Sequence, residues 1–147
     1  MSDNHMRDYS IRRLEKSADD LDTAMINYNA GKYDASANRA YYSVYHAIRA
    51  VLALDNIERK KHSGNISYFR EHYIATDVFD RAFSETIKNA ETLRNEADYD
   101  DMKTISAEDA HDVVEKAKLF YNAVKEYVET RLATHKSAQP KYEPADL

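Results

Sequence analysis

The chain has 147 residues and a formal net charge of −5, with 21 lysines and arginines against 26 aspartates and glutamates. It contains two glycines, two prolines and no cysteine, which excludes disulfides, thiolate metal sites and cysteine nucleophiles. Because sheet proteins need many turn residues, the scarcity of glycine and proline favours long helices, while the acidic balance argues against a generally basic nucleic-acid binder.

Two long helices are predicted in the first third of the chain. Over residues 7–30 the apolar positions recur at alternating spacings of three and four, which is typical of a helix with one buried face. Gly31 follows where a helix end favours a left-handed residue. We expect the second helix to begin with Asp34 as its N-cap and to run to about Leu54.

Three further helices are expected. A short one capped by Ser63 would reach Ile74, and a fourth would begin near residues 76–77 with Val78 facing inward. The fifth would begin after Ser106, in a sequence that resembles a capping box. The pattern predicts an all-α, antiparallel up-and-down helical bundle of four long helices and one short helix. We expect this bundle to span residues 1–134, followed by a flexible C-terminal tail at 135–147 that holds both prolines.

One face of the second helix is polar and lies opposite the apolar stripe. Its residues are Arg39, Tyr42, His46 and Arg49, with small residues such as Ala53 beside them. Two interpretations stay open: a solvated helix face, or a surface for self-association or ligand binding. Tyrosine, histidine and arginine on a small-residue background are typical of interfaces. The second interpretation makes Tyr42, His46, Arg49 and Ala53 a homodimer interface.

A basic run precedes the short third helix, at Arg59, Lys60, Lys61 and His62. A helix N-terminus favours anions, so the run could bind phosphate, although a solvated loop is the alternative. The six histidines include no pair at metal-ligand spacing on one helix, and the acidic residues at 96–101 fit no EF-hand loop. With two glycines, a phosphate loop cannot be built. We therefore expect no metal site and no cofactor.

Three segments resemble the small prokaryotic HEPN-domain proteins: YDASANRAYYSVYHA at 33–47, KKHSG at 60–64 and RNEADY at 94–99. The similarity spans about residues 8–133, with the segments in the expected order. It implies a five-helix bundle that pairs across a two-fold axis. Many members of the wider family are metal-independent endoribonucleases, often toxins encoded beside a small nucleotidyltransferase antitoxin.

The active site that this resemblance implies is an arginine, often followed by asparagine, with a histidine four to six residues further on. Arg94 and Asn95 match the first half, but Tyr99 stands where the nearest histidine is expected. A phenol has a pKa near 10 and is a poor base at neutral pH, so this departure counts against ribonuclease activity. His46 or His62 could replace the missing histidine.

Arg39 and His46 show the same spacing on the second helix. A rise of about 10.5 Å separates them, too far for a direct hydrogen bond, so we expect them to bracket a phosphate or a side chain of a dimer partner.

The leading hypothesis is a HEPN protein of a toxin–antitoxin or defence pair, a homodimer whose cleft binds RNA or a nucleotide. Its candidate catalytic residues are Arg94, Tyr99 and His46, and its candidate ligand-binding residues are Arg39, Asn95, Lys61 and His62. The alternative is a catalytically inert helical module that docks on a nucleotidyltransferase partner. A helical dimer without a ligand also stays open. No apolar run reaches the roughly 20 residues of a membrane span and residues 1–20 lack a signal-peptide core, so we expect a cytoplasmic protein.

Overall fold

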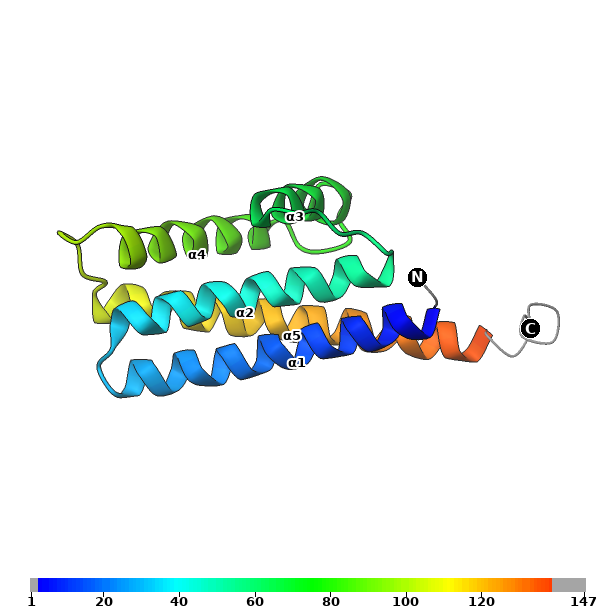
Figure 1. Cartoon of the computed structure of the whole chain (residues 1–147), viewed down its shortest axis with the longest axis horizontal. Coiled ribbons are helices and arrows are strands. Elements are labelled where there is room, and N and C mark those ends of the chain that lie inside the picture. The colour runs from blue at the N-terminus through cyan, green and yellow to red at the C-terminus, as the bar shows by residue number, and fades with distance from the viewer. Residues whose placement is uncertain (1–2, 139–147) are drawn as a thin grey trace.

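Five α-helices and one π-helical turn make up the computed structural model, which describes residues 3–138. They are α1 (Asp3–Asn29), α2 (Tyr33–Leu54), α3 (His62–Phe69), the π-helical turn η1 (Arg70–Ile74), α4 (Ala82–Tyr99) and α5 (Ala107–Ala138). The described residues contain no strand. The predicted all-α bundle of four long helices and one short helix is therefore confirmed (Figure 1).

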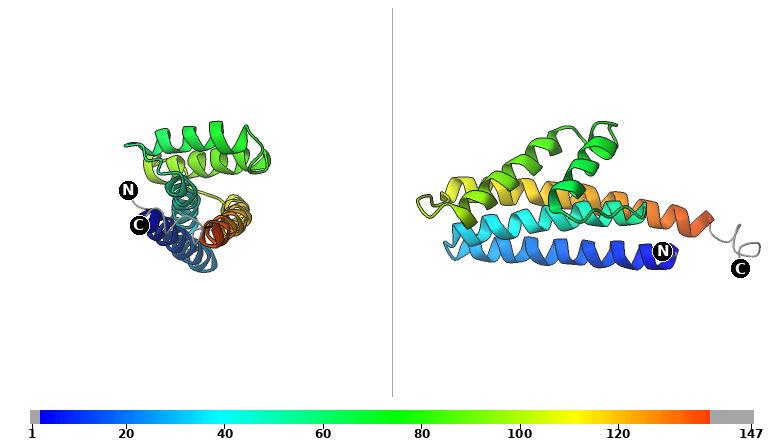
Figure 2. Two further views of the ribbon diagram at one scale, coloured as in Figure 1. Left: turned by 90° about the vertical axis from the view of Figure 1, so that its right-hand side faces the viewer. Right: turned by 45° about the horizontal axis from the view of Figure 1, so that its top comes forward.

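Helix α2 lies at the centre of the bundle. In the end-on view of Figure 2, α1 and α5 lie on one side of it, and α3 and α4 cross its other side. It contacts all four of these helices, and 14 of its 22 residues are buried. Its polar face is not the fully solvated face of the first interpretation, because Arg49 is only 8% exposed and Arg39, Tyr42 and His46 are half-buried.

The seam between α1 and α2 is built from small residues. Ser17 Oγ donates to the carbonyl oxygen of Ser43 at 2.7 Å, and Ser43 Oγ donates back to the carbonyl oxygen of Ser17 at 2.9 Å. Ser10 Oγ donates to the carbonyl oxygen of Ala50 at 2.7 Å. Such short side chains let the two backbones approach closely. The carbonyl oxygens of the facing helix accept hydrogen bonds from the buried serine hydroxyl groups. The small residues on the polar side of α2 therefore serve packing within the chain.

A second part of the core is aromatic and lies where α3 and the following loop meet α5. The rings of Phe69 and Phe120 meet edge to face, with centroids 5.7 Å apart, and Phe79 lies 5.3 Å from Phe69. Phe69 and Phe120 are fully buried. Burial of each such ring contributes about 1.5–3 kcal/mol of transfer free energy. This cluster fixes α3 and the loop before α4 on the bundle.

Several predicted helix starts are corrected by the structure. Helix α2 begins two residues earlier, because its N-cap is Lys32 rather than Asp34, and Lys32 makes no side-chain cap hydrogen bond. The carboxylate of Asp34 instead accepts the backbone N–H of Ile105 at 2.8 Å, which ties the start of α2 to the loop before α5. Ser63 lies inside α3, whose N-cap is Lys61. The predicted cap of α5 is confirmed, because Ser106 Oγ accepts the backbone N–H of Asp109 at 3.0 Å.

Helix α4 begins at Ala82 rather than near residues 76–77. Turns occupy most of residues 75–81, and Asp77 adopts a left-handed backbone with φ 64°. Val78 is 48% exposed, so its predicted inward position is wrong. At the other end of the chain, α5 is helical to Ala138, which includes four residues of the expected tail. The rest of that tail, 139–147, lies outside the described residues.

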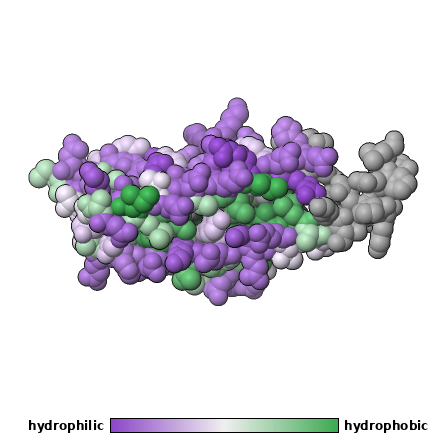
Figure 3. Space-filling view, turned by 90° about the horizontal axis from the view of Figure 1, so that it is seen from below, coloured by the Kyte–Doolittle hydropathy of each residue, from purple (hydrophilic) through white to green (hydrophobic). Residues whose placement is uncertain are grey.

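The face formed by α1 and α5 is mostly hydrophilic, with separate hydrophobic patches (Figure 3). The exposed large apolar side chains on these two helices are Ile11, Met25, Ile26 and Leu119. Among the helices of residues 3–138, none is long and apolar enough to cross a membrane.

Candidate functional site

Arg94 near the end of α4 is held by contacts on several sides. Its Nε donates to the carboxylate of Asp98 at 3.1 Å, and its Nη2 donates to the hydroxyl oxygen of Tyr42 on α2, also at 3.1 Å. The guanidinium carbon lies 5.1 Å from the ring centroid of Tyr41 and 5.4 Å from that of Tyr99. Among the described residues, no hydrogen bond uses Nη1. The arginine is therefore oriented by the protein with one donor nitrogen left for a ligand.

Asn95 and Tyr99, the other two residues of the family motif, differ in their environment. Tyr99 is 71% exposed, and its hydroxyl oxygen lies 3.5 Å from Nη2 of Arg94. Asn95 is exposed and forms no side-chain hydrogen bond to any described residue. Tyr99 therefore adjoins the guanidinium as the motif predicts, while no contact in the described chain links Asn95 to the site.

His62, the first residue of α3, is the histidine that lies beside Arg94. Its imidazole stacks on the ring of Tyr45, with centroids 3.8 Å apart, and its Nδ1 is 3.1 Å from the hydroxyl oxygen of Tyr41. Burial, followed by the nearby guanidinium of Arg94, lowers the pKa of His62 below its usual 6.5. The imidazole is therefore neutral at pH 7. No hydrogen bond from a side chain or backbone group that the structure describes uses its Nε2.

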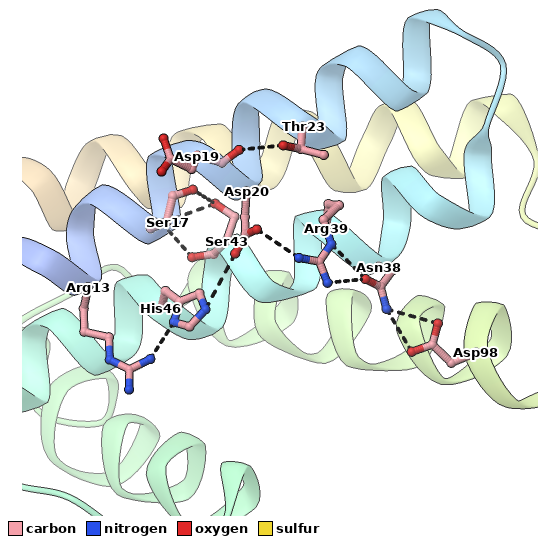
Figure 4. A network of polar contacts seen from close by, with 10 residues as sticks. All are labelled: Arg13, Ser17, Asp19, Asp20, Thr23, Asn38, Arg39, Ser43, His46 and Asp98. Atoms are coloured by element: carbon pink, nitrogen blue, oxygen red, sulfur yellow. Dashed lines mark hydrogen bonds and ion pairs between the residues drawn. The ribbon is translucent and has the colours of Figure 1, made fainter.

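Arg39 and His46 do bracket a carboxylate, and it belongs to α1 of the same chain. Nη1 of Arg39 donates to Asp20 Oδ1 at 3.0 Å, and Nε2 of His46 lies 3.6 Å from Asp20 Oδ2 (Figure 4). The expectation that the pair lies too far apart for a direct bond agrees with this bridged arrangement. In the single chain, Asp20 takes the place that we assigned to a phosphate or a partner's side chain.

His46 is constrained on both sides of its ring. Arg13 Nη1 lies 2.9 Å from Nδ1 of His46, and because a guanidinium only donates, Nδ1 is the acceptor. The proton of the neutral ring then lies on Nε2, facing Asp20. Burial, followed by the charge of Arg13, lowers the pKa of His46 to about 4. With its lone pair engaged by Arg13, His46 is a poor candidate for proton transfer to a ligand.

A continuous line of polar contacts links His46 to Arg94. Arg39 donates to Asn38 Oδ1 at 3.0 and 2.7 Å, and Asn38 Nδ2 donates to both carboxylate oxygens of Asp98 at 3.1 and 2.9 Å (Figure 4). Asp98 in turn accepts from Arg94. We call this line, from Arg13 through His46, Asp20, Arg39, Asn38 and Asp98 to Arg94, the polar chain. It crosses from α1 over α2 to α4, so the position of Arg94 depends on all three helices.

The four residues predicted for the dimer interface separate into two pairs. Arg49 and Ala53 are 8% and 5% exposed, covered within the chain, so they offer little surface to a second copy. Arg49 Nη2 donates to the hydroxyl oxygen of Tyr9 on α1 at 2.7 Å. Tyr42 and His46 are only partly buried and could still contact a partner.

The acidic run after Arg94 is used by the protein itself. Asp98 belongs to the polar chain, Glu96 lies 3.6 Å from the ammonium of Lys103, and Asp100 accepts the backbone N–H of Met102 at 3.0 Å. Among the side chains that the structure describes, no three histidine or acidic groups gather in a way that could hold a metal ion. These carboxylates are best explained as partners of nearby cations and backbone donors.

Sequence reasoning missed several residues that build the site. Neither Tyr41 nor Tyr45 was predicted as a site residue, yet the hydroxyl group of Tyr41 and the ring of Tyr45 position His62. Asp20 and Arg13 on α1 were not predicted either, yet they contact Arg39 and His46. The unusual density of tyrosine in residues 41–45 was the available signal, since buried tyrosines need hydrogen-bond partners.

The amino-acid sequence is similar to one protein family and to several known proteins. The HEPN domain family matches residues 11–127, and the chain belongs to this family. It is 34% identical over 115 residues to "Putative toxin MJ0142" of Methanocaldococcus jannaschii, covering 78% of each chain. It is 28% identical over 112 residues to "Putative toxin MJ0605" of the same organism, covering 76% of this chain and 83% of that one. A UPF0332 protein of Archaeoglobus fulgidus is 30% identical over 118 residues, covering 80% and 91%. The family resemblance expected from the three segments is confirmed.

Proposed function

We propose that this HEPN protein acts as the toxin of a toxin–antitoxin or defence-type pair and binds RNA or a nucleotide at Arg94. One observation carries the proposal: Asp98 and Tyr42 fix the guanidinium group of Arg94 beside the neutral imidazole of His62. The two toxin-named relatives support the toxin role. Phosphate is the ligand class that a planar, pre-oriented guanidinium recognises best.

The charges around Arg94 support an anionic ligand. The chain as a whole carries −5, yet the charges that lower the pKa of His62 are the cations of Arg94, Arg49 and Arg13. Asp98 neutralises part of the charge of Arg94, but it engages Nε and leaves Nη1 open. A phosphate could therefore accept from Nη1 without breaking the pair. Lys61 is exposed beside His62 and adds a further cation at the edge of the site.

His62 is the side chain best placed to exchange a proton with a bound RNA. When its Nδ1–H donates to the hydroxyl oxygen of Tyr41, Nε2 presents a lone pair. That lone pair can accept the proton of a ribose 2′-hydroxyl group that attacks the adjacent phosphate. Tyr99 donates a hydrogen bond at best, because a phenol is a poor base at neutral pH. In this proposal Arg94 binds the phosphate, Tyr99 adjoins it and His62 carries the proton.

We further propose that the protein is a homodimer that pairs near Tyr42 and His46. These two residues keep partial exposure beside the polar chain, while Arg49 and Ala53 are enclosed. Pairing there would bring two copies of Arg94 to one cleft, because Arg94 contacts Tyr42 directly. Static light scattering at micromolar concentration tests this, and a monomer would contradict it.

A second candidate function is an inert module that docks on a nucleotidyltransferase. Two observations favour it: Tyr99 replaces the motif histidine, and His46 has its lone pair engaged by Arg13. In that case the surface around Tyr99 would contact a protein rather than RNA. The nucleotidyltransferase encoded by a neighbouring gene, where present, is the partner to test.

Binding and cleavage of a fluorescent 12-nucleotide single-stranded RNA test the proposed function. We expect wild type to bind, Arg94→Lys to bind at least about tenfold more weakly because a lysine cannot form the planar fork, and His62→Gln to bind but cleave less. Arg12→Lys is the matched control, since Arg12 is an exposed arginine on α1 paired with Glu15. Equal affinity of wild type and Arg94→Lys would overturn the proposal. Docking of a nucleotidyltransferase without any RNA binding would favour the second candidate.

A further inference from the structure

A second cluster of cations and rings lies outside the contacts of Arg94. The guanidinium carbon of Arg59 lies 5.0 Å from the ring centroid of Tyr68, and the rings of Tyr68 and His72 are 4.1 Å apart at 30°. We call these three residues the Arg59 stack. They come from the loop before α3, from α3 and from the π-helical turn η1. Arg59 and His72 are exposed, and Tyr68 is half-buried.

The backbone of Arg59 is fixed by a fully buried asparagine. Asn65 Oδ1 accepts the backbone N–H of Arg59 at 2.9 Å, and Asn65 Nδ2 donates to the carbonyl oxygen of Arg59 at 3.2 Å. The same Nδ2 donates to the hydroxyl oxygen of Tyr45 at 2.9 Å. Because the ring of Tyr45 stacks on His62, one buried side chain positions both the Arg59 stack and the histidine of the candidate site.

Gly64 leaves the space that the Arg59 side chain needs. A Cβ atom at position 64 would lie 3.1 Å from Cβ of Arg59, closer than ordinary van der Waals contact. The segment KKHSG therefore combines a residue that makes room for Arg59 with a neighbour, Asn65, that clamps its backbone. The loop backbone is therefore fixed at the point where the exposed side chain of Arg59 leaves it.

The charges of this cluster also lack partners within the described part of the chain. Arg59, Lys60 and Lys61 are exposed, and none forms an ion pair with a carboxylate whose side chain the structure describes. The acidic residues nearest in the sequence have other partners: Glu58 lies 3.7 Å from Arg49, Asp55 lies 2.9 Å from Nη2 of Arg131, and Glu71 lies 3.5 Å from Nε2 of His72. Three adjacent uncompensated cations on an acidic protein mark a surface for an anionic chain.

We propose that the Arg59 stack is a second RNA subsite, which binds single-stranded RNA that extends from the Arg94 site. Phosphates would pair with Arg59, Lys60 and Lys61, and an unpaired base would stack on the Tyr68–His72 rings. Stacking on aromatic rings beside a basic groove is how proteins hold single strands without reading their sequence. An acidic protein partner would use the cations but not the ring stack. The inference rests on the proposed function, because it assumes RNA at Arg94.

The test compares two lengths of RNA. We expect a fluorescent 12-nucleotide single strand to contact both subsites and a trinucleotide to contact the Arg94 site alone. We expect Arg59→Gln and Tyr68→Leu each to weaken binding of the 12-mer about tenfold and to leave trinucleotide binding unchanged. Arg59→Gln should also lower the slope of log affinity against log salt by about 0.7, the value for one lost phosphate contact on a single strand. Arg12→Gln is the control for loss of an exposed arginine.

Each outcome decides between the claims. If Arg59→Gln binds both RNAs like wild type while Arg94→Lys weakens both, the second subsite is wrong and the proposed function stands. If wild type binds neither RNA, both fail. If Arg59→Gln instead loses binding to a nucleotidyltransferase with RNA affinity unchanged, the surface is a protein interface and the inference is overturned. Circular dichroism melting of Tyr68→Leu shows whether that variant loses RNA binding because it unfolds. Arg59→Gln changes an exposed residue and should melt like wild type.

Discussion

Arg94 on α4 donates a hydrogen bond to the hydroxyl oxygen of Tyr42 on α2, across 52 residues of sequence, with Nη2 3.1 Å from the oxygen. Together with the ion pair to Asp98, this bond holds the guanidinium from two helices. A mobile arginine would lose side-chain entropy on binding a ligand, whereas this one has already lost it on folding. The site is therefore pre-organised for an anion.

We expect Arg94→Ala to lower the free energy of unfolding by about 1–3 kcal/mol, as urea denaturation would measure. The side chains of Arg94 and Asp98 are only 21% and 26% exposed, so their pair is less screened than a surface pair, and cation–π contacts are lost as well. An exposed i,i+4 pair would be worth only about 0.3–0.5 kcal/mol. A change within that smaller range would show that Arg94 is not held as described.

Stability should fall as the pH is lowered from about 6.5 towards 4, and His46 should account for part of the fall. Burial lowers the pKa of folded His46 to about 4, so the unfolded chain binds a proton in this interval that the folded chain does not. The contribution of His46 is complete above pH 6.5 and is lost as the pH falls through its folded pKa. Its size is about 3 kcal/mol.

The control for this pH profile is His46→Gln, which has no titrating ring and should flatten the loss between pH 6.5 and 4. Burial raises the pKa of Asp20, whose contribution therefore has the opposite sign near its own pKa. Asp20 lies beside position 46 in both proteins, so the difference between the two profiles reports on His46 together with its effect on Asp20. Identical profiles would mean that His46 is solvated and free to titrate.

Ala53→Glu should destabilise the fold rather than report on dimer formation. Ala53 is 5% exposed, and a carboxylate there would be buried without a partner, at a cost of about 3 kcal/mol or more. Ala35→Glu, at an exposed position in the first turn of the same helix, should leave the melting temperature nearly unchanged. Equal melting temperatures for the two variants would contradict the burial of this part of α2.

Tyr99→His should increase RNA cleavage. Tyr99 is 71% exposed, so the fold should accept the change, and an imidazole there would lie close to Nη2 of Arg94 with a pKa near neutrality. Met102→His places a histidine at a position that is 92% exposed and makes no side-chain contact with Arg94. Cleavage by gel assay should rise in the first variant only. No gain in Tyr99→His would favour the docking module.

The fold could be predicted because its signals are local. The heptad spacing of α1, the glycine at 31 and the cap at Ser106 are each read within a few residues, and the structure contains all three. The start of α4 was misplaced because Asp77 takes a left-handed backbone conformation and the buried Phe79 continues an apolar pattern through a turn. Such a turn is stabilised by long-range packing, which a local pattern does not contain.

The candidate site was only half predictable. Arg94 could be found from its motif, but the role of His62 depends on the folding of α3 across Tyr41 and Tyr45, which sequence spacing does not reveal. The small-residue face of α2 did indicate a covered surface. The covering element is α1 of the same chain, and a wheel of one helix cannot distinguish a neighbour in the chain from a second copy.

The central claim is that Arg94 and His62 together bind a phosphate of RNA. NMR tests it most directly, by following the ring nitrogens of His62 and the Nε–H group of Arg94. The protein is titrated with a dinucleotide whose 2′-hydroxyl group is replaced by hydrogen. This ligand keeps the phosphate and cannot be cleaved. The account predicts saturable shifts at both residues and a rise in the pKa of His62, because a phosphate nearby favours the imidazolium ion. Unchanged signals at Arg94 and His62, with the dinucleotide in large excess, would contradict it.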